Sequence, residues 1–282
     1  MNTYEMITNR ILEKMKTGQV PWRRPWKFQA PRNLVSNRRY HGINFLLLTD
    51  NEYESPYYVT FHQAKQLGGS IKKGEHGTPI VFWKLIETLE KSAENGEEKP
   101  KVIPYLQYST VFNLSQTEGI DTPKDALQPL NPIAVCENII EGFTDKPETV
   151  HTHLPKAYYQ PATDSIHMPA KSSFVSIEGY YATLFHEYVH ATGHEKRLNR
   201  HAQENTNFDF GSKDYSKEEL VAELGSAFLC AEAQIDNSVI DNNAAYLNAW
   251  LKELEEDKKL IIYASAKAGK AVDYIRNKSG EE

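Results

Sequence analysis

The residues best suited to chemistry in this chain of 282 residues are His186-Glu187-Tyr188-Val189-His190. Two histidines four positions apart lie on one face of a helix, so both imidazoles can bind a single ion. A catalytic zinc ion takes three protein ligands and leaves a fourth position for water. Glu187 lies beside the pair and can accept a proton from that water as a general base. The motif therefore predicts the centre of a metallopeptidase-type site with one zinc ion.

The third ligand has to come from outside this motif. In the extended pattern His-Glu-x-x-His-x-x-Gly-x-x-His the last position is Lys196, whose ammonium group is not a metal ligand. His194 becomes a ligand only if the helix ends at Gly193 and lets it swing in. A second predicted helix carries Glu219 and Glu223 on one face among apolar residues, and gluzincin-type peptidases take their third ligand from such a helix.

We predict Glu219 as the ligand and Glu223 as the carboxylate that hydrogen-bonds a ligating histidine, with the reverse assignment left open. The structural alternative is that Ser216 and Glu219 form a capping box at the start of the helix. Two histidines and a glutamate favour zinc, and manganese or cobalt can occupy the same donors.

Apolar periodicity predicts the elements that position this site. The second half of the chain is predicted to be a small sheet followed by long helices. The strand at residues 165–168 is expected to form a cleft edge with which an extended peptide could pair, although it could equally be an ordinary edge strand. The predicted helices are residues 132–143, 176–194, 216–234, 241–254 and 256–276. The predicted strands are residues 149–154, 157–160 and 165–168.

The N-terminal part of the chain has a different chemistry. Residues 1–73 carry 12 lysines and arginines against 5 acidic residues, whereas the net charge of the whole chain is −6. In residues 20–61, aromatic residues alternate with cations, as in proteins that stack single-stranded bases on aromatic faces and contact phosphates with basic side chains. The alternative is that half of these aromatics belong to the core. The residues predicted to contact single-stranded DNA are Trp22, Arg23, Arg24, Trp26, Lys27, Arg32, Arg38, Arg39 and Tyr40.

The predicted fold class is α+β, with an N-terminal α+β domain at residues 1–122, a linker at 123–132 and a gluzincin-like metallopeptidase domain at 133–282. In the first domain we expect a helix at residues 4–17, and two strands joined by a flexible hairpin loop. These strands are residues 79–84 and 105–112, and the loop runs from Glu90 to Lys101.

Composition restricts the setting in which this chain works. Cys136 and Cys230 are too few for a disulfide scaffold, and two buried thiols in a reducing cytoplasm are expected. No apolar run approaches the ~20 residues that cross a bilayer, so no membrane partner is expected. We find no signal peptide, which also favours a cytoplasmic location.

Long motifs in both halves resemble one known family. Those of the first half include Pro21-Trp22-Arg23-Arg24-Pro25-Trp26, Tyr40-His41-Gly42-Ile43-Asn44, Thr60-Phe61-His62-Gln63-Ala64 and Val111-Phe112-Asn113-Leu114-Ser115-Gln116-Thr117. They are similar to the N-terminal domain of ArdC-type antirestriction proteins, which is also found at the head of plasmid TraC-type primases. Those of the second half look like that family's zincin-like metallopeptidase domain and include Asp164-Ser165-Ile166-His167-Met168-Pro169, the segment from Phe185 to His194, and Glu218-Glu219-Leu220-Val221-Ala222-Glu223.

The resemblance implies a protein of a mobile element that binds single-stranded DNA and protects incoming DNA from host restriction after conjugation. Two functions stay open at this point. One is a zinc peptidase that DNA binding delivers to a protein substrate, such as a host restriction enzyme. The other is a protection module whose metal site is structural or vestigial.

Overall fold

The structure of the chain is a computed structural model. It describes residues 1–23, 30–50, 53, 55–91, 98–123, 131–200, 213–237 and 244–277, with only the backbone described at 87–91, 98–101, 213 and 244–246. Of the predicted DNA-contact residues, Arg24, Trp26 and Lys27 lie outside the described residues, as does most of the predicted linker.

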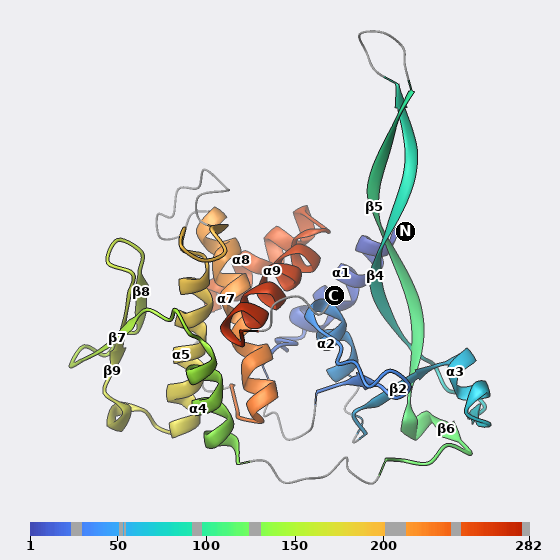
Figure 1. Cartoon of the computed structure of the whole chain (residues 1–282), viewed down its shortest axis with the longest axis horizontal. Coiled ribbons are helices and arrows are strands. Elements are labelled where there is room, and N and C mark those ends of the chain that lie inside the picture. The colour runs from blue at the N-terminus through green and yellow to red at the C-terminus, as the bar shows by residue number, and fades with distance from the viewer. Residues whose placement is uncertain are drawn as a thin grey trace.

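The first half of the chain is built around a four-stranded mixed sheet with the order β1-β2-β5-β4 (Figure 1). The helix expected at residues 4–17 is α1, which starts with a capping box formed by Asn2 and Glu5. A second, two-stranded sheet pairs β3 with β6. The helices are α1 (Thr3–Lys16), α2 (Gly42–Thr49), α3 (Phe61–Gln66) and the 3-10 turn η1 (Leu114–Gln116). The strands are β1 (Arg32–Asn33), β2 (Tyr57–Thr60), β3 (Ser70–Ile71), β4 (Thr78–Lys91), β5 (Glu98–Asn113) and β6 (Thr117–Glu118).

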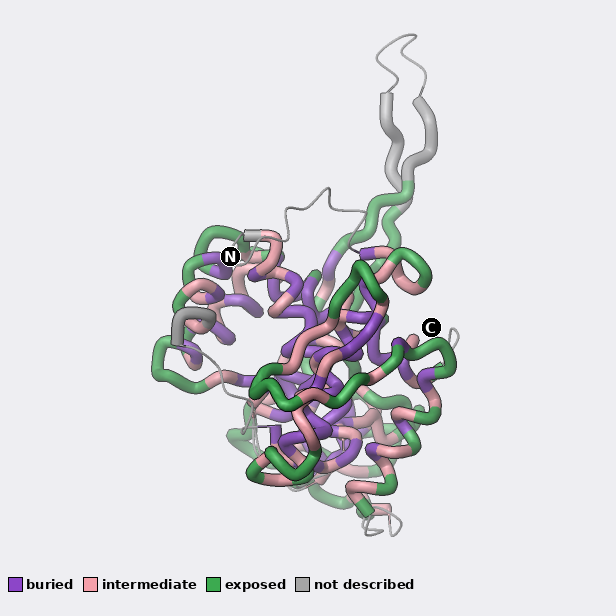
Figure 2. Tube along the Cα trace, turned by 90° about the vertical axis from the view of Figure 1, so that its left-hand side faces the viewer, coloured by how far each residue is buried: buried purple, intermediate pink, exposed green. Residues whose placement is uncertain are grey.

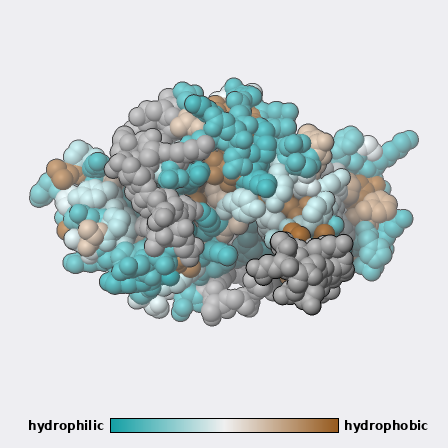
Figure 3. All heavy atoms as spheres, turned by 90° about the horizontal axis from the view of Figure 1, so that it is seen from above, coloured by the Kyte–Doolittle hydropathy of each residue, from teal (hydrophilic) through white to brown (hydrophobic). Residues whose placement is uncertain are grey.

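Strands β4 and β5 form a long antiparallel ribbon that rises away from the helices (Figure 1). They pair from Thr78 opposite Val111 to Lys91 opposite Glu98, so both strands are longer than expected. The predicted loop from Glu90 to Lys101 was therefore too wide, because its described residues at both ends belong to the strands. Apolar side chains of the ribbon stay exposed. On the face seen from above, brown apolar atoms are scattered among hydrophilic ones (Figure 3).

The second half is a three-stranded sheet followed by long helices, as predicted. The sheet has the order β7-β9-β8, which makes β9 the central strand. The prediction that residues 165–168 form a cleft edge is therefore wrong, because hydrogen-bonding neighbours cover β9 on both sides. The elements are α4 (Pro132–Gly142), β7 (Glu148–Thr152), β8 (Tyr158–Gln160), β9 (Ser165–Pro169), η3 (Lys171–Ser173), α5 (Ile177–Thr192), α7 (Lys213–Ala233), α8 (Ala244–Glu256) and α9 (Leu260–Ile275).

Helix α7 begins three residues earlier than expected, at Lys213. Ser216 is therefore inside the helix, and its backbone carbonyl accepts a hydrogen bond of 3.1 Å from the indole N–H of Trp250. The capping-box alternative for Glu219 is wrong for this reason, since a capping residue has to stand before the first turn.

One apolar core joins the two halves of the chain. Buried residues run through α1, α2, α5, α7 and α9, where Figure 2 shows the dense purple centre of the molecule. Phe45 of α2 packs edge-on against Phe228 of α7, with ring centroids 5.3 Å apart. Trp22, which follows α1, packs edge-on against Trp250 of α8 at 5.8 Å. The α+β fold class is confirmed, and none of the described helices is long and apolar enough to cross a membrane.

Candidate metal centre

Helices α5 and α7 bring three metal-binding side chains to one point. Ser176 caps α5 by accepting the backbone N–H of Gly179, and the helix then carries both histidines on the face that meets α7. Glu219 lies opposite them, with its oxygens 3.5 Å from His186 Nε2 and 3.4 Å from His190 Nε2. One ligand atom from each residue falls within 4.8 Å of the other two.

This donor set fits a single divalent metal ion. Two imidazole nitrogens and one carboxylate oxygen are the protein ligands of a catalytic zinc site with one open position. His186 Nε2 and His190 Nε2 lie only 3.1 Å apart, and such close ring nitrogens can share a ligand or a proton. The expectation that these two histidines and Glu219 act as the ligands stays a prediction, and their arrangement agrees with it.

The charges around the three side chains favour ion pairing. Burial opposes protonation of His186, but its hydrogen bond with Glu219 raises the pKa of this imidazole above its ordinary value. Burial also opposes protonation of His190, and the negative charge of Glu219 raises the pKa of His190 further. For Glu219, burial is outweighed by the charge of His190 and by hydrogen bonds with both histidines, which hold the pKa of this carboxyl far below its ordinary value. Glu219 therefore stays ionised, as a carboxylate that binds a cation has to be.

A second carboxylate supports His190. Glu218 Oε1 lies 3.7 Å from His190 Nδ1, and the buried Arg200 holds Glu218 through a contact of 2.6 Å. The guanidinium of Arg200 also donates to the Thr192 hydroxyl and to the carbonyl of Val189. Carboxylates behind ligating histidines fix the orientation of the imidazole. Sequence reasoning missed Glu218 and Arg200, although a buried arginine and a glutamate beside a ligand are the signals that could have pointed to them.

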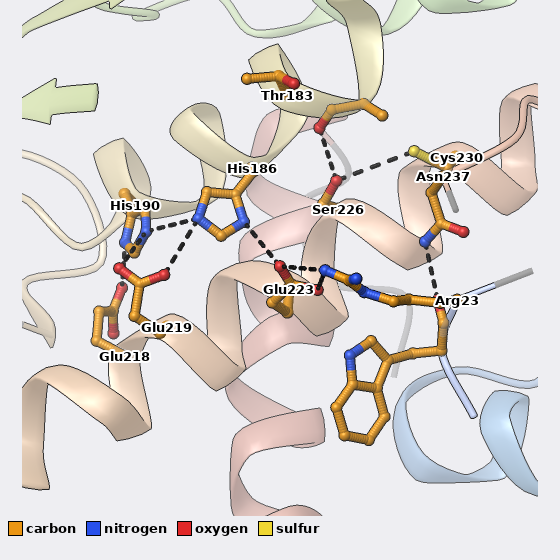
Figure 4. A network of polar contacts seen from close by, with 12 residues as sticks. Arg23, Thr183, His186, His190, Glu218, Glu219, Glu223, Ser226, Cys230 and Asn237 are labelled. Carbon is orange, nitrogen blue, oxygen red and sulfur yellow. Dashed lines mark hydrogen bonds and ion pairs between the residues drawn. The ribbon is translucent and has the colours of Figure 1, made fainter. Parts of the chain in front are cut away.

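Glu223 lies beside the other histidine, as Figure 4 shows. Its Oε1 lies 3.9 Å from His186 Nδ1, and the guanidinium of Arg23 lies 3.4 Å from the same oxygen. The assignment of Glu219 to the centre and Glu223 to its periphery therefore agrees with the geometry. The remaining role, that of Glu187 as general base, stays a prediction; its side chain is buried beside the two histidines.

His194 does not join the three side chains. Helix α5 ends at Thr192, and Gly193 keeps right-handed backbone angles instead of reversing the chain. The Nδ1 atom of His194 accepts a hydrogen bond from the backbone N–H of Lys196. The alternative in which His194 is the third ligand thus has no support in the geometry.

Comparison with known proteins identifies the family. A model of the N-terminal domain of the anti-restriction factor ArdC matches residues 1–112, and a model of zincin-like metallopeptidases matches residues 138–267. The metal-free crystal structure of the antirestriction ArdC protein from the R388 plasmid has a TM-score of 0.81 and 36% identity, covering 99% of this chain and 98% of that one. The chain belongs to the ArdC family of antirestriction proteins. The Mn(II)-bound structure of the R388 protein has a TM-score of 0.78 and 34% identity, with 100% and 99% coverage.

Curated relatives place the ArdC-type domains in different contexts. Two proteins of Escherichia coli, each named DNA primase TraC, are 34% and 33% identical over 96% of this chain, which spans only 27% and 20% of their lengths. The uncharacterized protein y4eC of Sinorhizobium fredii (strain NBRC 101917 / NGR234) is 31% identical, with 96% of this chain and 91% of that protein covered.

The predicted DNA-contact residues of this ArdC-family chain lie in unlike surroundings. Trp22 is fully buried against Trp250, so its ring is not available to stack on a base in this conformation. Arg23 contacts Glu223 of α7. Arg39 donates a hydrogen bond of 3.0 Å to Glu232, which also belongs to α7. Both arginines therefore connect the N-terminal half to α7.

The other described members lie around the turn after β1. Arg38 is exposed, whereas Tyr40 is partly buried and packs edge-on against Tyr58 at 6.3 Å. Burial raises the pKa of the Tyr40 hydroxyl. The Arg32 guanidinium lies 6.0 Å from the ring centroid of Tyr57, and burial lowers its pKa, helped by the charge of Arg39. The sequence left open that half of the aromatics belong to the core, but it did not indicate which ones.

Proposed function

We propose that this chain is an antirestriction protein of a mobile element that binds single-stranded DNA and holds one zinc ion at His186, His190 and Glu219. The observation that carries the proposal is the convergence of these three side chains on one point, in a chain of the ArdC family. A structure of the R388 relative is Mn(II)-bound, which supports the binding of a divalent ion by this chain. The protein acts in the cytoplasm on incoming DNA.

The chain's own residues have distinct tasks in this proposal. A divalent ion held by His186, His190 and Glu219 would supply Lewis acidity and would lower the pKa of a nearby water molecule. Glu187 receives the proton from that water at its carboxylate and passes it on to the leaving amine. Glu218 lies behind the imidazole of His190 and Glu223 behind that of His186, where a carboxylate can set the orientation of the ring. This supports cleavage of a protein substrate, and a host restriction enzyme is the candidate that fits antirestriction.

Replacement of Glu187 by glutamine tests the catalytic part. The variant should bind zinc and single-stranded DNA as the wild type does, because no ligand is removed, and should lose cleavage of the partner protein by at least about 100-fold, the usual contribution of a general base. Cleavage of candidate proteins is followed by gel electrophoresis and mass spectrometry. The exposed Glu195, replaced in the same way, is the matched control and should keep full activity.

The alternative function is a single-stranded DNA protector without proteolysis. The observation that supports this alternative is the concentration of basic and aromatic residues in the N-terminal half. A Glu187→Gln variant that protects incoming DNA fully in cells, with no protein cut by the wild type, would establish this alternative in place of the peptidase.

DNA binding is tested by its dependence on salt. Affinity for an oligothymidylate should fall steeply between low and physiological salt, because phosphate contacts release counterions. Arg38→Ala should weaken binding and reduce the salt slope by about one, since the exposed Arg38 contributes one phosphate contact. Fluorescence anisotropy measures both effects, and Lys16→Ala, on the exposed face of α1, is the control. An affinity that salt leaves unchanged would contradict the proposal.

A further inference from the structure

Arg23 connects the N-terminal half of the chain to the outer part of the metal centre. Its Nη2 atom lies 3.4 Å and 3.5 Å from the two carboxylate oxygens of Glu223. Both side chains are largely buried, with 14% of Arg23 and 4% of Glu223 exposed. Figure 4 shows Glu223 between Arg23 and His186, so one carboxylate faces a guanidinium on one side and an imidazole on the other.

The imidazole on the other side lacks its usual support. His186 Nδ1 is buried and has no hydrogen-bond partner among the described residues. Glu223 Oε1 lies 3.9 Å from this atom, which is too far for a hydrogen bond. A histidine that ligates a metal nearly always donates its second ring N–H to a carboxylate, a carbonyl or water. Glu223 thus lies near Nδ1 of His186 but beyond hydrogen-bonding distance, while Arg23 contacts both carboxylate oxygens of Glu223.

The two arginines behind the centre are held with different strength. Arg200, behind Glu218, comes from the same half of the chain as the histidines and makes four hydrogen bonds, two to Glu218, one to Thr192 and one to Val189. Among the described residues, Arg23 has a side-chain partner only in Glu223, and its Nε atom has none. Arg23 also lies in the cation-rich segment of the N-terminal half. An incoming anion can therefore displace Glu223 from Arg23 more easily than it can displace Glu218 from Arg200.

We propose that Arg23 is a positioning residue that holds Glu223 away from His186, and that phosphates of single-stranded nucleic acid compete with Glu223 for it. When phosphates take Arg23, Glu223 comes within reach of the Nδ1–H of His186 and orients that imidazole toward the ion. Nucleic acid and metal then tighten each other's binding, because the coupling between two sites is reciprocal. The inference rests on the single-stranded DNA binding of the proposed function.

The restraint, meaning the effect by which Arg23 holds Glu223 away from His186, is tested without DNA. Zinc affinity is measured by competition with a chromophoric chelator for the wild type and for Arg23→Gln. The variant should bind zinc about tenfold more tightly, at the lower end of the effect of outer partners on metal affinity. Arg23→Lys keeps the positive charge and should stay near the wild type. Unchanged or weaker zinc binding by a folded Arg23→Gln variant overturns the proposal.

Two controls separate the restraint from a general effect on the fold. Lys16→Gln removes another ion pair between the two halves, that of Lys16 with Glu255, and should leave zinc affinity unchanged. In a Glu223→Gln background the Arg23→Gln substitution should have no further effect, because its target carboxylate is gone. Thermal unfolding confirms that each variant is folded. An equal gain in zinc affinity with and without the Glu223 carboxylate overturns the role of this residue.

The competition is tested in the wild-type protein with an oligothymidylate. Fluorescence anisotropy of the labelled strand reports DNA binding, and the chelator assay reports zinc affinity in the same solution. The strand should tighten zinc binding by about the same factor as Arg23→Gln does, and it should add nothing to that variant. A strand that binds without changing zinc affinity overturns this inference and leaves the proposed function standing. A strand that does not bind overturns both.

Discussion

At the scale of single residues, the centre combines two partly buried imidazoles with one carboxylate, and its charge state depends on pH. In the folded chain the hydrogen bond and charge of Glu219 raise the pKa of His186 and of His190 above the ordinary value of 6.5. The pairing with the histidines lowers the pKa of Glu219 below its ordinary 4.5. Protons and a metal ion compete for the same imidazoles, so both metal binding and the stability of the metal-free protein follow this titration.

The metal-free protein should lose stability as the pH rises. Groups whose pKa is raised by folding contribute stability fully below their unfolded value, near 6.5, and lose it as the pH rises through the folded pKa. The ionised Glu219 contributes stability above about pH 4.5, which is its pKa in the unfolded chain. This contribution is lost only in acid, as the pH falls through the pKa of Glu219 in the folded chain. Thermal unfolding in the presence of a chelator should therefore show a falling Tm above pH 6.5, and zinc affinity should rise over the same interval.

Glu219→Gln is the control for this prediction. Without the negative charge of this carboxylate, the pKa of both histidines should return toward its ordinary value, so the fall in Tm should disappear. Zinc binding should be lost or strongly weakened, because one ligand is gone. A Glu219→Gln variant with the same dependence of Tm on pH as the wild type would contradict the assignment.

At the scale of elements, the close approach of α5 and α7 decides whether the three ligands can meet. Gly225 of α7 faces Val189 of α5, which lies between the two histidines. A Cβ atom added at Gly225 would lie 2.7 Å and 2.9 Å from the two γ-carbons of Val189. Ser226 strengthens the same contact, since its hydroxyl donates to the Ala182 carbonyl at 2.8 Å. The helices can therefore pack at this distance only with glycine at position 225.

Gly225→Ala should force the two helices apart. Overpacking of this kind lowers the free energy of unfolding by about 1–3 kcal/mol, and the displaced histidines should also bind zinc more weakly. Urea unfolding and chelator competition measure the two effects. The matched control is Gly269→Ala in α9, where no heavy atom lies within 4 Å of the added Cβ; it should raise helix stability by up to about 1 kcal/mol. If both alanine variants behave alike, the packing argument fails.

At the scale of the whole molecule, the two halves are parts of one core. Trp22 is 0% exposed, its backbone carbonyl accepts from Asn237 at 2.8 Å, and its ring lies against Trp250. The Thr8 hydroxyl of α1 donates to the carbonyl of Lys258 in the second half. The proposed nucleic-acid binding at the N-terminal half and the proposed metal binding on α5 and α7 would therefore take place on one connected body.

Trp22→Ala should destabilise the whole chain. Truncation of a fully buried tryptophan costs about 3–5 kcal/mol, and because the core is shared, the second half should unfold in the same single transition. Circular dichroism of the helices and tryptophan fluorescence, followed in urea, should give coincident curves. Trp83→Ala, at a position that is 41% exposed on the ribbon, should cost less. Two separated transitions, with the helical one unaffected by Trp22→Ala, would contradict a shared core.

The sequence by itself was sufficient for the features that depend on neighbouring residues. The two histidines of the motif meet because helix geometry alone places positions four apart on one face. Glu219 was selected because it lies among apolar residues of a second helix, and the α+β order followed from the change of periodicity along the chain. The motifs of both halves were long enough to indicate the family, which the comparisons confirm.

Only the tertiary structure decided which charged and aromatic side chains of the N-terminal half stay at the surface. Trp22 and Arg23 look like DNA contacts in the sequence, yet Trp22 is in the core and Arg23 lies against Glu223, 200 positions away along the chain. In the same way, β9 became a central strand and Arg200 reached the carboxylate behind His190. Contacts between distant segments depend on how whole elements pack, and no local pattern of residues encodes that packing.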